Sequence, residues 1–365
     1  MSHRVLLLFS DDSTLFFALR MRALLEPLDC AVELGWMTDK SALSYRQLSE
    51  NLPGGPDVLI TNAAFKTPKS FEGYDALITS RIFAPLRDMM RRVHVRMSSD
   101  RPVVISFQGG LDFTPEKGFQ NRAPADAVFI VPASDIEAFR EHSEKHHFTW
   151  QHVGFGHPSF VRQDPLERAP EKRDVYFFAQ AISPISLKAR LHIIDMLAIL
   201  AERDPSRDVY IKLRHLPGEN ENHLHKEMFD YPSLIEKHRP NAPNNLKLTA
   251  CTMDEAMENA GLGITCTSTA AVDLVRAGVP TQVYLDYVEN YLDPLCEPMR
   301  HLFETSNLIS TLPEIMDGTT QMPDLDWLAN MFCPTSLGQE VLDSIDHVRE
   351  KAIRVDHVIP VFPDT

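Results

Sequence analysis

Charged and imidazole side chains gather just after an apolar segment in the second half of the chain. The segment DVYIKL (208–213) is typical of a strand and runs directly into RHLPGENENH. The cluster contains two cations, one acid and three histidines: Lys212, Arg214, His215, Glu219, His223 and His225. Cations at a strand end can bind phosphate oxygens, and the imidazole of His215 can donate or shuttle a proton. The alternatives are a solvated loop or a zinc site at three of the histidines, whose spacing matches no standard ligand signature.

Three consecutive hydroxyl residues follow the apolar segment LGITC: Thr267, Ser268 and Thr269. A small-residue helix over 270–277 comes next, carries Asp273 and is ended by Gly278. A strand, a hydroxyl turn and a helix leave backbone N–H groups free at the helix start, where a phosphate can bind. The simpler interpretation is an ordinary βαβ unit with a polar cap and no ligand.

Further candidates lie after other apolar segments. They are two aspartates after 4–9, two glycines and an aspartate after 102–106, and a glutamine and a serine after 174–179: Asp11, Asp12, Gly109, Gly110, Asp112, Gln180 and Ser183. The three aspartates are candidate general bases. Asp12 or Ser13 can equally well cap the next helix, and the paired glycines can form either a ligand-binding loop or a plain turn.

Strand and helix patterns alternate along the chain, which is typical of a parallel sheet covered by helices on both faces. The alternation stops over 150–173, where prolines, glycines and charges are typical of a linker, and it starts again at 174. We therefore expect two α/β halves with a cleft between them. In such sheets ligands bind outside the carboxyl ends of the strands, where the candidate residues lie.

Composition favours a globular protein of about two domains, given 365 residues of which 44% are hydrophobic. With 36 basic and 51 acidic residues the net charge is −15, which disfavours nucleic acid or an anionic membrane as a general partner. Five scattered cysteines are typical of reduced thiols in a cytoplasm, and neither a signal peptide nor a membrane-spanning segment is recognisable. We expect a cytoplasmic protein.

An arginine-rich stretch over 81–96 is the nearest approach to a membrane-binding element. Four arginines fall on the expected helix or directly after it: Arg87, Arg91, Arg92 and Arg96. We expect at most a weak peripheral contact, in which this face docks a lipid-linked acceptor.

The layout resembles the two-domain GT-B glycosyltransferases over nearly the whole chain. TSTAAVDLVRAGVP (267–280) is similar to the phosphate-binding turn and helix of that family, and VGFGHPSF (153–160) is similar to the segment that ends its first domain. The resemblance implies two Rossmann-like domains facing a cleft, with C-terminal helices that cross back. The implied parts are an acceptor domain, a linker, a nucleotide-sugar domain and a helical segment packing on the first domain: 1–160, 161–173, 174–336 and 337–365.

Within this fold, KLRHLPGE (212–219) resembles the lysine and His-Pro motif of bacterial sialyl- and Kdo-transferases, which use CMP sugars. The resemblance implies that His215 contacts the CMP phosphate and that Ser268 and Thr269 assist it. In this chain Leu216 separates His215 from the proline, which is a departure from the motif. The other residues that we expect to bind the nucleotide come from the two segments themselves: Lys212, Arg214, Glu219, Thr267 and Asp273. No metal or cofactor is implied beyond the nucleotide-sugar donor, because such enzymes offset the leaving-group charge with helix N-termini and basic side chains.

Three classes of function are therefore compatible with the sequence. The first is a transferase that moves an acidic sugar from a CMP donor to a bacterial surface glycan. The second keeps the fold but changes the chemistry, to a CDP-glycerol glycerophosphotransferase or a UDP-sugar transferase or epimerase. The third is a non-catalytic two-domain protein that binds an anion.

Overall fold

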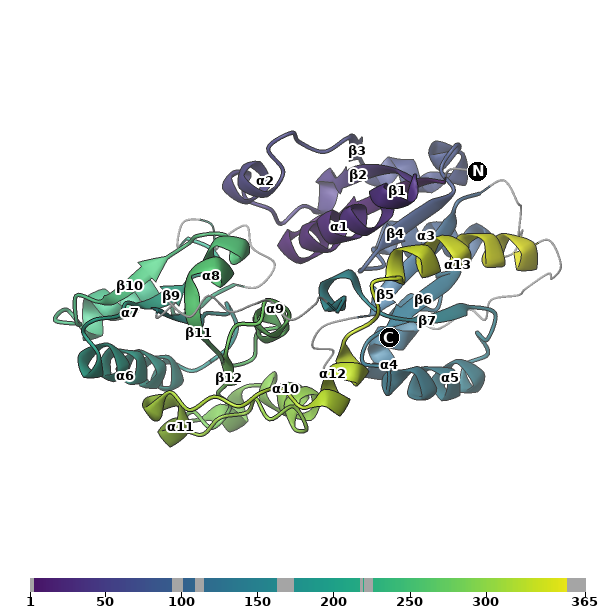
Figure 1. The fold of residues 1–365 in the computed structure, drawn as a ribbon. Coiled ribbons are helices and arrows are strands. Elements are labelled where there is room, and N and C mark those ends of the chain that lie inside the picture. The colour runs from purple at the N-terminus through teal and green to yellow at the C-terminus, as the bar shows by residue number, and fades with distance from the viewer. Residues whose placement is uncertain are drawn as a thin grey trace. The chain divides into compact units, whose positions relative to one another are not determined.

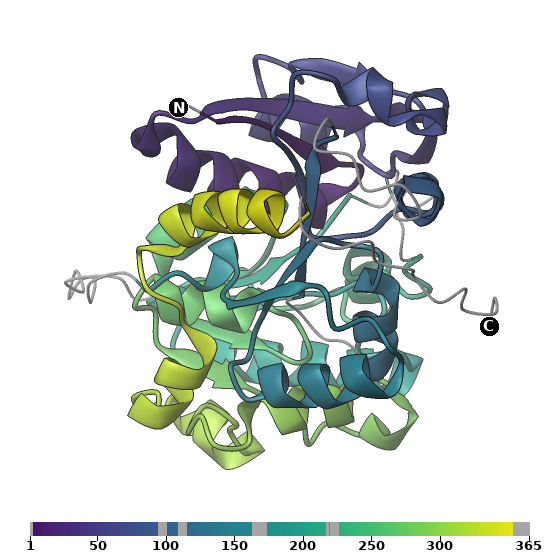
Figure 2. The same cartoon turned by 90° about the vertical axis from the view of Figure 1, so that its right-hand side faces the viewer.

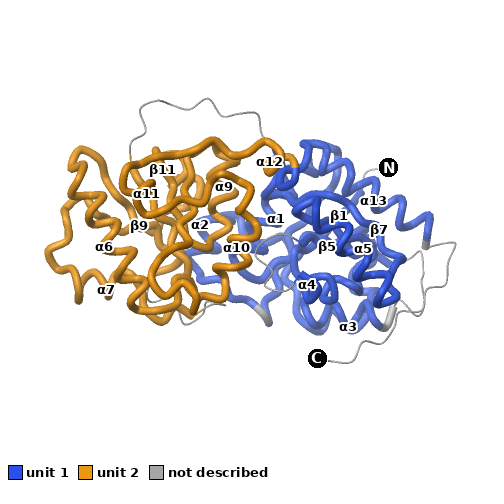
Figure 3. The backbone as a smooth tube through the Cα atoms, turned by 90° about the horizontal axis from the view of Figure 1, so that it is seen from below, with its two compact units in different colours: residues 1–162, 330–365 blue, residues 163–329 orange. Residues whose placement is uncertain are grey.

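The computed structural model describes residues 3–93, 101–108, 115–162, 174–216, 219 and 226–352. The chain forms two compact units, residues 1–162 with 330–365 and residues 163–329 (Figure 3). Each unit contains one parallel sheet with helices packed against it, which confirms the predicted α/β class. The unit boundaries lie after residues 162 and 329, whereas the sequence placed the linker at 161–173 and the last boundary after 336.

The first unit is built on a seven-stranded sheet in the order β3-β2-β1-β4-β5-β6-β7 (Figure 1). Its strands are β1 Arg4–Phe9, β2 Ala31–Met37, β3 Val58–Ile60, β4 Ala76–Thr79, β5 Val103–Gln108, β6 Ala127–Ile130 and β7 His152–Phe155. Every pair is parallel. The central strand β1 is buried from its second residue onward, and such a strand must be apolar on both faces.

Helices cover both faces of this sheet. They are α1 Asp12–Leu25, α2 Tyr45–Asn51, α3 Ala84–Val93, α4 Pro115–Arg122, α5 Asp135–Lys145 and α13 Leu337–Ala352. Successive side chains of β1 point to opposite faces, so Val5 and Leu7 pack with α1 and α13, while Leu6 and Leu8 pack with α3, α4 and α5. Two apolar clusters therefore sandwich the sheet.

The last described helix returns to the first unit. Leu337, Val341 and Ile345 of α13 join the apolar cluster that contains Phe17 of α1. Figure 2 shows α13, in yellow, lying alongside α1, in purple. The predicted return of the C-terminal helices onto the first half is therefore part of the fold.

The second unit contains a five-stranded parallel sheet in the order β10-β9-β8-β11-β12. Its strands are β8 Asp174–Phe178, β9 Val209–Lys212, β10 Leu246–Thr249, β11 Ala260–Thr265 and β12 Thr281–Val283. The helices of this part of the chain are α6 Leu187–Arg203, α7 Tyr231–His238, α8 Met253–Asn259, α9 Ala270–Arg276, α10 Cys296–Phe303, α11 Leu312–Asp317 and α12 Leu325–Met331. The last of these, α12, runs across the boundary into the first unit.

Two glycines fix the position of α9 against β11. Gly278 has φ 68°, a left-handed conformation that favours glycine, and its N–H donates to Val275 at 3.0 Å as the chain leaves the helix. Gly263 of β11 lies directly against the side chain of Leu274, so a Cβ added at this glycine would come within 2.4 Å of that side chain. The predicted strand, turn, helix and glycine therefore form one tightly packed βαβ unit.

The helices within the described ranges are too short or too polar to cross a membrane.

Candidate functional site

The carboxyl edge of the β8–β12 sheet collects most of the candidates from the second half of the sequence. In the strand register Phe178 of β8 lies beside Lys212 of β9 on one side and beside Thr265 of β11 on the other. The segments that follow β9 and β11 therefore emerge on either side of β8. Two strand spacings separate them, or about 10 Å. Open α/β sheets bind ligands at this edge.

The hydroxyl turn after β11 contains one buried and two accessible groups. Thr267 is buried, and its hydroxyl donates to Oε1 of Gln180 at 2.8 Å, so each side chain fixes the other. The hydroxyl of Ser268 accepts from the N–H of Ala270 at 3.2 Å, and Thr269 is exposed without a side-chain cap bond to α9. Ser268 and Thr269 are therefore placed to meet a ligand, whereas Thr267 holds the loop after β8.

The predicted acidic member of this turn is used within its own helix. Asp273 lies in the first turn of α9, and Nη2 of Arg276 lies 3.3 Å from its carboxylate. Both side chains are partly buried. An acid that is already paired with a cation one turn later is suited to stabilising the helix.

The cations after β9 differ in exposure. Lys212 is 9% exposed and its ammonium donates to the carbonyl of Leu213 at 3.3 Å, whereas Arg214 is half-buried. Glu219 accepts from the N–H of Leu216 at 2.8 Å and donates its own N–H to the carbonyl of that residue, so it stabilises the turn. Arg214 is therefore the cation of this segment that is best placed to contact a ligand.

His215 is buried beside an acid. It is 3% exposed, and its Nε2 lies 3.9 Å from a carboxylate oxygen of Glu227. The same carboxylate also pairs with Arg190, so the guanidinium and the imidazole share it. His223 and His225, the other members of the predicted histidine cluster, lie outside the described residues.

The sequence interpretation missed Arg190, which connects several loops at this edge. Its guanidinium lies on α6, is 1% exposed and pairs with the carboxylate of Glu227. It donates to four backbone carbonyls at 2.7–3.0 Å: Gln180, Ala181, Pro184 and Phe229. Arg190 therefore joins the loop after β8 to the segment that faces His215. Helical periodicity could have indicated that Arg190 is buried, since Ile193, Ile194 and Leu197 follow this arginine at helical spacing on the apolar face of α6.

A second buried network joins the loops after β8 and β12. One carboxylate oxygen of Asp293, which is 4% exposed, accepts from the hydroxyls of Ser183 and Tyr287, each at 2.5 Å. Burial, and then nearby groups that include Asp293, raise the pKa of Tyr287, so the phenol keeps its proton and donates. The thiol of Cys296 lies 3.2 Å from the same phenol oxygen, and burial raises its pKa to about 11. Ser183 is therefore a structural member of this edge rather than an exposed one.

The first unit places Asp11 and Asp12 at the carboxyl end of β1. Asp11 is the N-cap of α1: its Oδ1 accepts from the N–H and the hydroxyl of Thr14, each at 2.9 Å. Its other oxygen accepts from Nη1 of Arg81 at 2.7 Å. Asp12 is half-buried in the first turn of the helix. Of these two carboxylates, Asp12 has the greater access to an incoming hydroxyl.

Several candidates fall outside what the structure describes. Gly109, Gly110 and Asp112, together with Arg96, lie outside the described residues, and nothing is described of the side chain of Arg92. Arg87 and Arg91 lie on α3. Within the described ranges there is no group of three or more His, Cys, Asp or Glu side chains that could hold a metal ion.

A protein-family model described as "Putative glycosyltransferase (DUF6716)" matches residues 5–348. The chain belongs to this family. No curated protein matches the chain in sequence. Family membership agrees with the glycosyltransferase resemblance in the sequence, and it leaves the sugar donor unassigned.

Solved structures with the same fold cover nearly the whole chain. The Staphylococcus aureus MnaA–UDP structure has a TM-score of 0.57 at 10% identity, covering 96% of this chain and 97% of that one. A Listeria monocytogenes protein, titled a putative UDP-N-acetylglucosamine 2-epimerase, has a TM-score of 0.53 at 11% identity, covering 99% of this chain and 93% of that one. Acinetobacter baumannii MurG has a TM-score of 0.51 at 12% identity, covering 95% of this chain and 100% of that one. These likenesses confirm the predicted GT-B fold, and none of the three titles names CMP.

Proposed function

We propose that this family member is a glycosyltransferase that binds a nucleotide-sugar donor at the carboxyl edge of the β8–β12 sheet. The observation that carries the proposal is the placement of Arg214 on one side of β8 and of Ser268 and Thr269 on the other. A diphosphate is long enough to reach both groups, a guanidinium pairs well with phosphate oxygens, and hydroxyls donate to them.

The donor that we favour is a UDP sugar. One neighbour of the same fold was solved with UDP, and another is titled a putative UDP-N-acetylglucosamine 2-epimerase. The CMP sugar suggested by the KLRHLPGE segment is the alternative, because Leu216 interrupts the motif in this chain. A neutral or an acidic sugar is compatible with the same phosphate contacts.

The proposed reaction is the transfer of the sugar to a saccharide hydroxyl. The acceptor oxygen forms a bond to the anomeric carbon, the bond from that carbon to the phosphate oxygen breaks, and the nucleotide leaves with the electron pair. A general base takes the acceptor proton, and Asp11, Asp12 and Asp112 stay the candidates that the sequence offers for it. Lys212 and Arg214, with the hydroxyls of Ser268 and Thr269, offset the charge that develops on the leaving phosphate.

His215 has one proposed task at the leaving group. A ring N–H donates to the departing phosphate, and the carboxylate of Glu227 lies 3.9 Å from Nε2 of the same ring. Because these cations and donors can offset the leaving-group charge themselves, we propose that the reaction requires no metal. EDTA is then expected to leave the rate unchanged.

The test is nucleotide release from a panel of UDP, GDP and CMP sugars and CDP-glycerol, with simple glycoside acceptors and EDTA present. We expect release from one sugar-nucleotide class, and His215→Ala should slow it by about 100-fold. His238→Ala, which removes an exposed histidine at the end of α7, is the matched control. Accumulation of a 2-epimer of the sugar, release of CMP from CDP-glycerol without release from any sugar nucleotide, or no release at all would contradict the proposal.

A further inference from the structure

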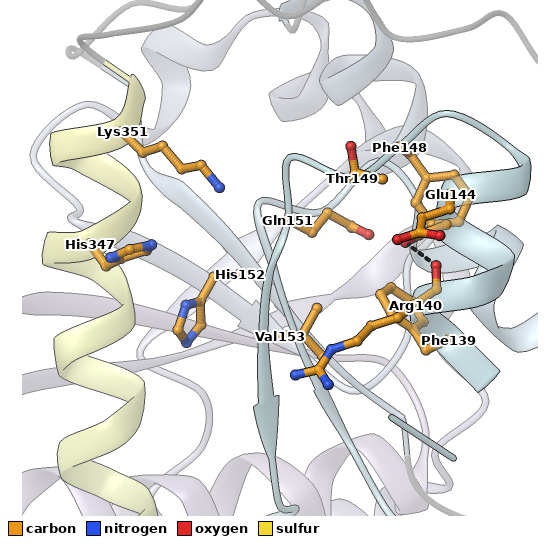
Figure 4. Close-up of a pocket in the computed structure, with 11 residues that line it drawn as sticks. Phe139, Arg140, Glu144, Phe148, Thr149, Gln151, His152, Val153, His347 and Lys351 are labelled. Atoms are coloured by element: carbon orange, nitrogen blue, oxygen red, sulfur yellow. Dashed lines mark hydrogen bonds between the residues drawn. The ribbon is translucent and has the colours of Figure 1, made fainter. Parts of the chain in front are cut away.

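The first unit contains a cavity of about 300 Å³ at the amino end of β7, which is the last strand of its sheet. Its walls come from the second half of α5, the segment before β7 and the end of α13 (Figure 4). The candidate residues of this unit, Asp11 and Asp12, follow β1 at its carboxyl end. All of these strands are parallel, so the cavity lies at the amino ends of the strands and the two aspartates lie at the carboxyl ends. The cavity is therefore a separate site.

The polar groups around this cavity carry an excess of positive charge. Arg140 reaches toward β7 from α5, and His347 and Lys351 reach toward His152 from α13 (Figure 4). The rings of His152 and His347 lie 5.1 Å apart, and the ammonium of Lys351 donates to the carbonyl of Trp150 at 3.4 Å. Glu144 is the acidic lining residue. Among the lining residues two permanent cations and two imidazoles outnumber one carboxylate, and Glu137, outside the lining, pairs with Arg140 at 3.4 Å. This balance favours an anionic ligand.

The lining also contains a buried acceptor. Gln151 is 7% exposed, and its amide nitrogen donates to the carbonyls of Arg122 and Ala125, each at 2.8 Å. Its Oε1 has no hydrogen-bond partner among the residues that the structure describes. Figure 4 shows this amide pointing to the α5 side of the cavity. Since a buried acceptor without a partner costs free energy, a ligand hydroxyl that donates to Oε1 would be stabilising.

We propose that this cavity binds a small polyhydroxylated anion, a sugar that carries a carboxylate or a phosphate. The anionic group lies between Arg140, His347 and Lys351, and a hydroxyl of the sugar donates to Oε1 of Gln151. The volume is at the lower limit of ligand pockets, which suits one sugar ring rather than a nucleotide. This inference does not depend on the function proposed for the other unit.

Binding at this site should strengthen as the pH falls. The titratable and charged groups that line the cavity with His152 are His347 and Lys351 on α13 and Arg140 and Glu144 on α5. Burial, and next His347 and Lys351, lower the pKa of His152 below its ordinary value. An anion opposes that shift, so binding takes up a proton and its affinity rises through the acidic range.

The test is calorimetric titration of the whole chain with D-glucuronate, whose charge is constant between pH 5.5 and 8, and with glucose 6-phosphate. We expect one site with a Kd near 1 mM. Affinity for glucuronate should be at least about fivefold higher at pH 5.5 than at pH 8. D-glucose lacks the charge and propionate lacks the hydroxyls, so both should bind at least about tenfold more weakly. The tighter of the two anions identifies the natural class.

Lys351→Met and His347→Ala should each lower glucuronate affinity, the first by about tenfold. Lys145→Met is the matched control, because it removes an exposed lysine of α5 that does not line the cavity. Gln151 is left unchanged in these variants, since its amide nitrogen also bonds the backbone. Equal binding of glucose and glucuronate, binding unaffected by Lys351→Met, or no binding of either anion would overturn the proposal.

Discussion

Arg190→Leu is expected to destabilise the second unit by about 3–5 kcal/mol, the range found when one partner of a buried ion pair is removed. Arg190 is 1% exposed, pairs with Glu227 and donates to four backbone carbonyls. Leucine fills part of the volume, but it leaves those carbonyls and the carboxylate without the cation that faces them. Urea unfolding followed by circular dichroism measures the change in the free energy of unfolding.

Arg203→Leu is the matched control for this prediction. Arg203 lies on the same helix, is exposed and donates to the carbonyl of Met316 at 2.9 Å. Its replacement should change stability by no more than about 0.5 kcal/mol. Equal effects of the two substitutions would contradict the role assigned to Arg190. Arg190→Lys should recover only part of the loss, because an ammonium cannot reproduce the planar fork of donors.

Asp293→Ala is expected to cost about 3 kcal/mol, because the aspartate accepts three hydrogen bonds in a buried position. Besides the hydroxyls of Ser183 and Tyr287, the N–H of Leu295 donates to it at 3.0 Å. Alanine leaves these donors buried without their acceptor. Asp293→Asn keeps an acceptor oxygen and should cost less. The measurement is again urea unfolding of the whole chain.

Asp286→Ala tests whether the effect belongs to this network. Asp286 follows β12, is exposed and pairs with Arg300 at 2.9 Å. An exposed pair contributes about 1 kcal/mol at most, so its loss should be small. If Asp293→Ala proved no more destabilising than Asp286→Ala, Asp293 would not be holding the loops after β8 and β12 together.

Local patterns in the sequence predicted most of the fold. Apolar runs such as 4–9 and 262–266 became strands, and Gly278 ended α9 in the left-handed conformation expected of it. These features depend on neighbouring residues, which is why spacing and residue type were sufficient. The return of α13 to the first unit came instead from the resemblance to a known family.

The candidate site was less predictable, because its contacts depend on which segments the fold brings together. The described candidates from the second half of the chain did gather at one edge, but Thr267 and Ser183 are bonded to other loops rather than exposed. The roles of Arg190 and Asp293 required the register of the sheet. Asp11 shows the same limitation: it caps α1, where the sequence had suggested Asp12, because a shift of one residue in the helix start changes which side chain caps it.

The central claim is that the carboxyl edge of the β8–β12 sheet binds the nucleotide. Calorimetric titration of the whole chain with UDP, CMP and GDP, without metal, tests it most directly. Arg214→Leu and Ser268→Ala alter the two sides of the proposed site, and Arg239→Leu removes an exposed arginine just after α7 as a control. We predict one bound nucleotide, with affinity at least about tenfold lower in Arg214→Leu and unchanged in Arg239→Leu. Absence of nucleotide binding, or binding unaffected by both site variants, would contradict the account.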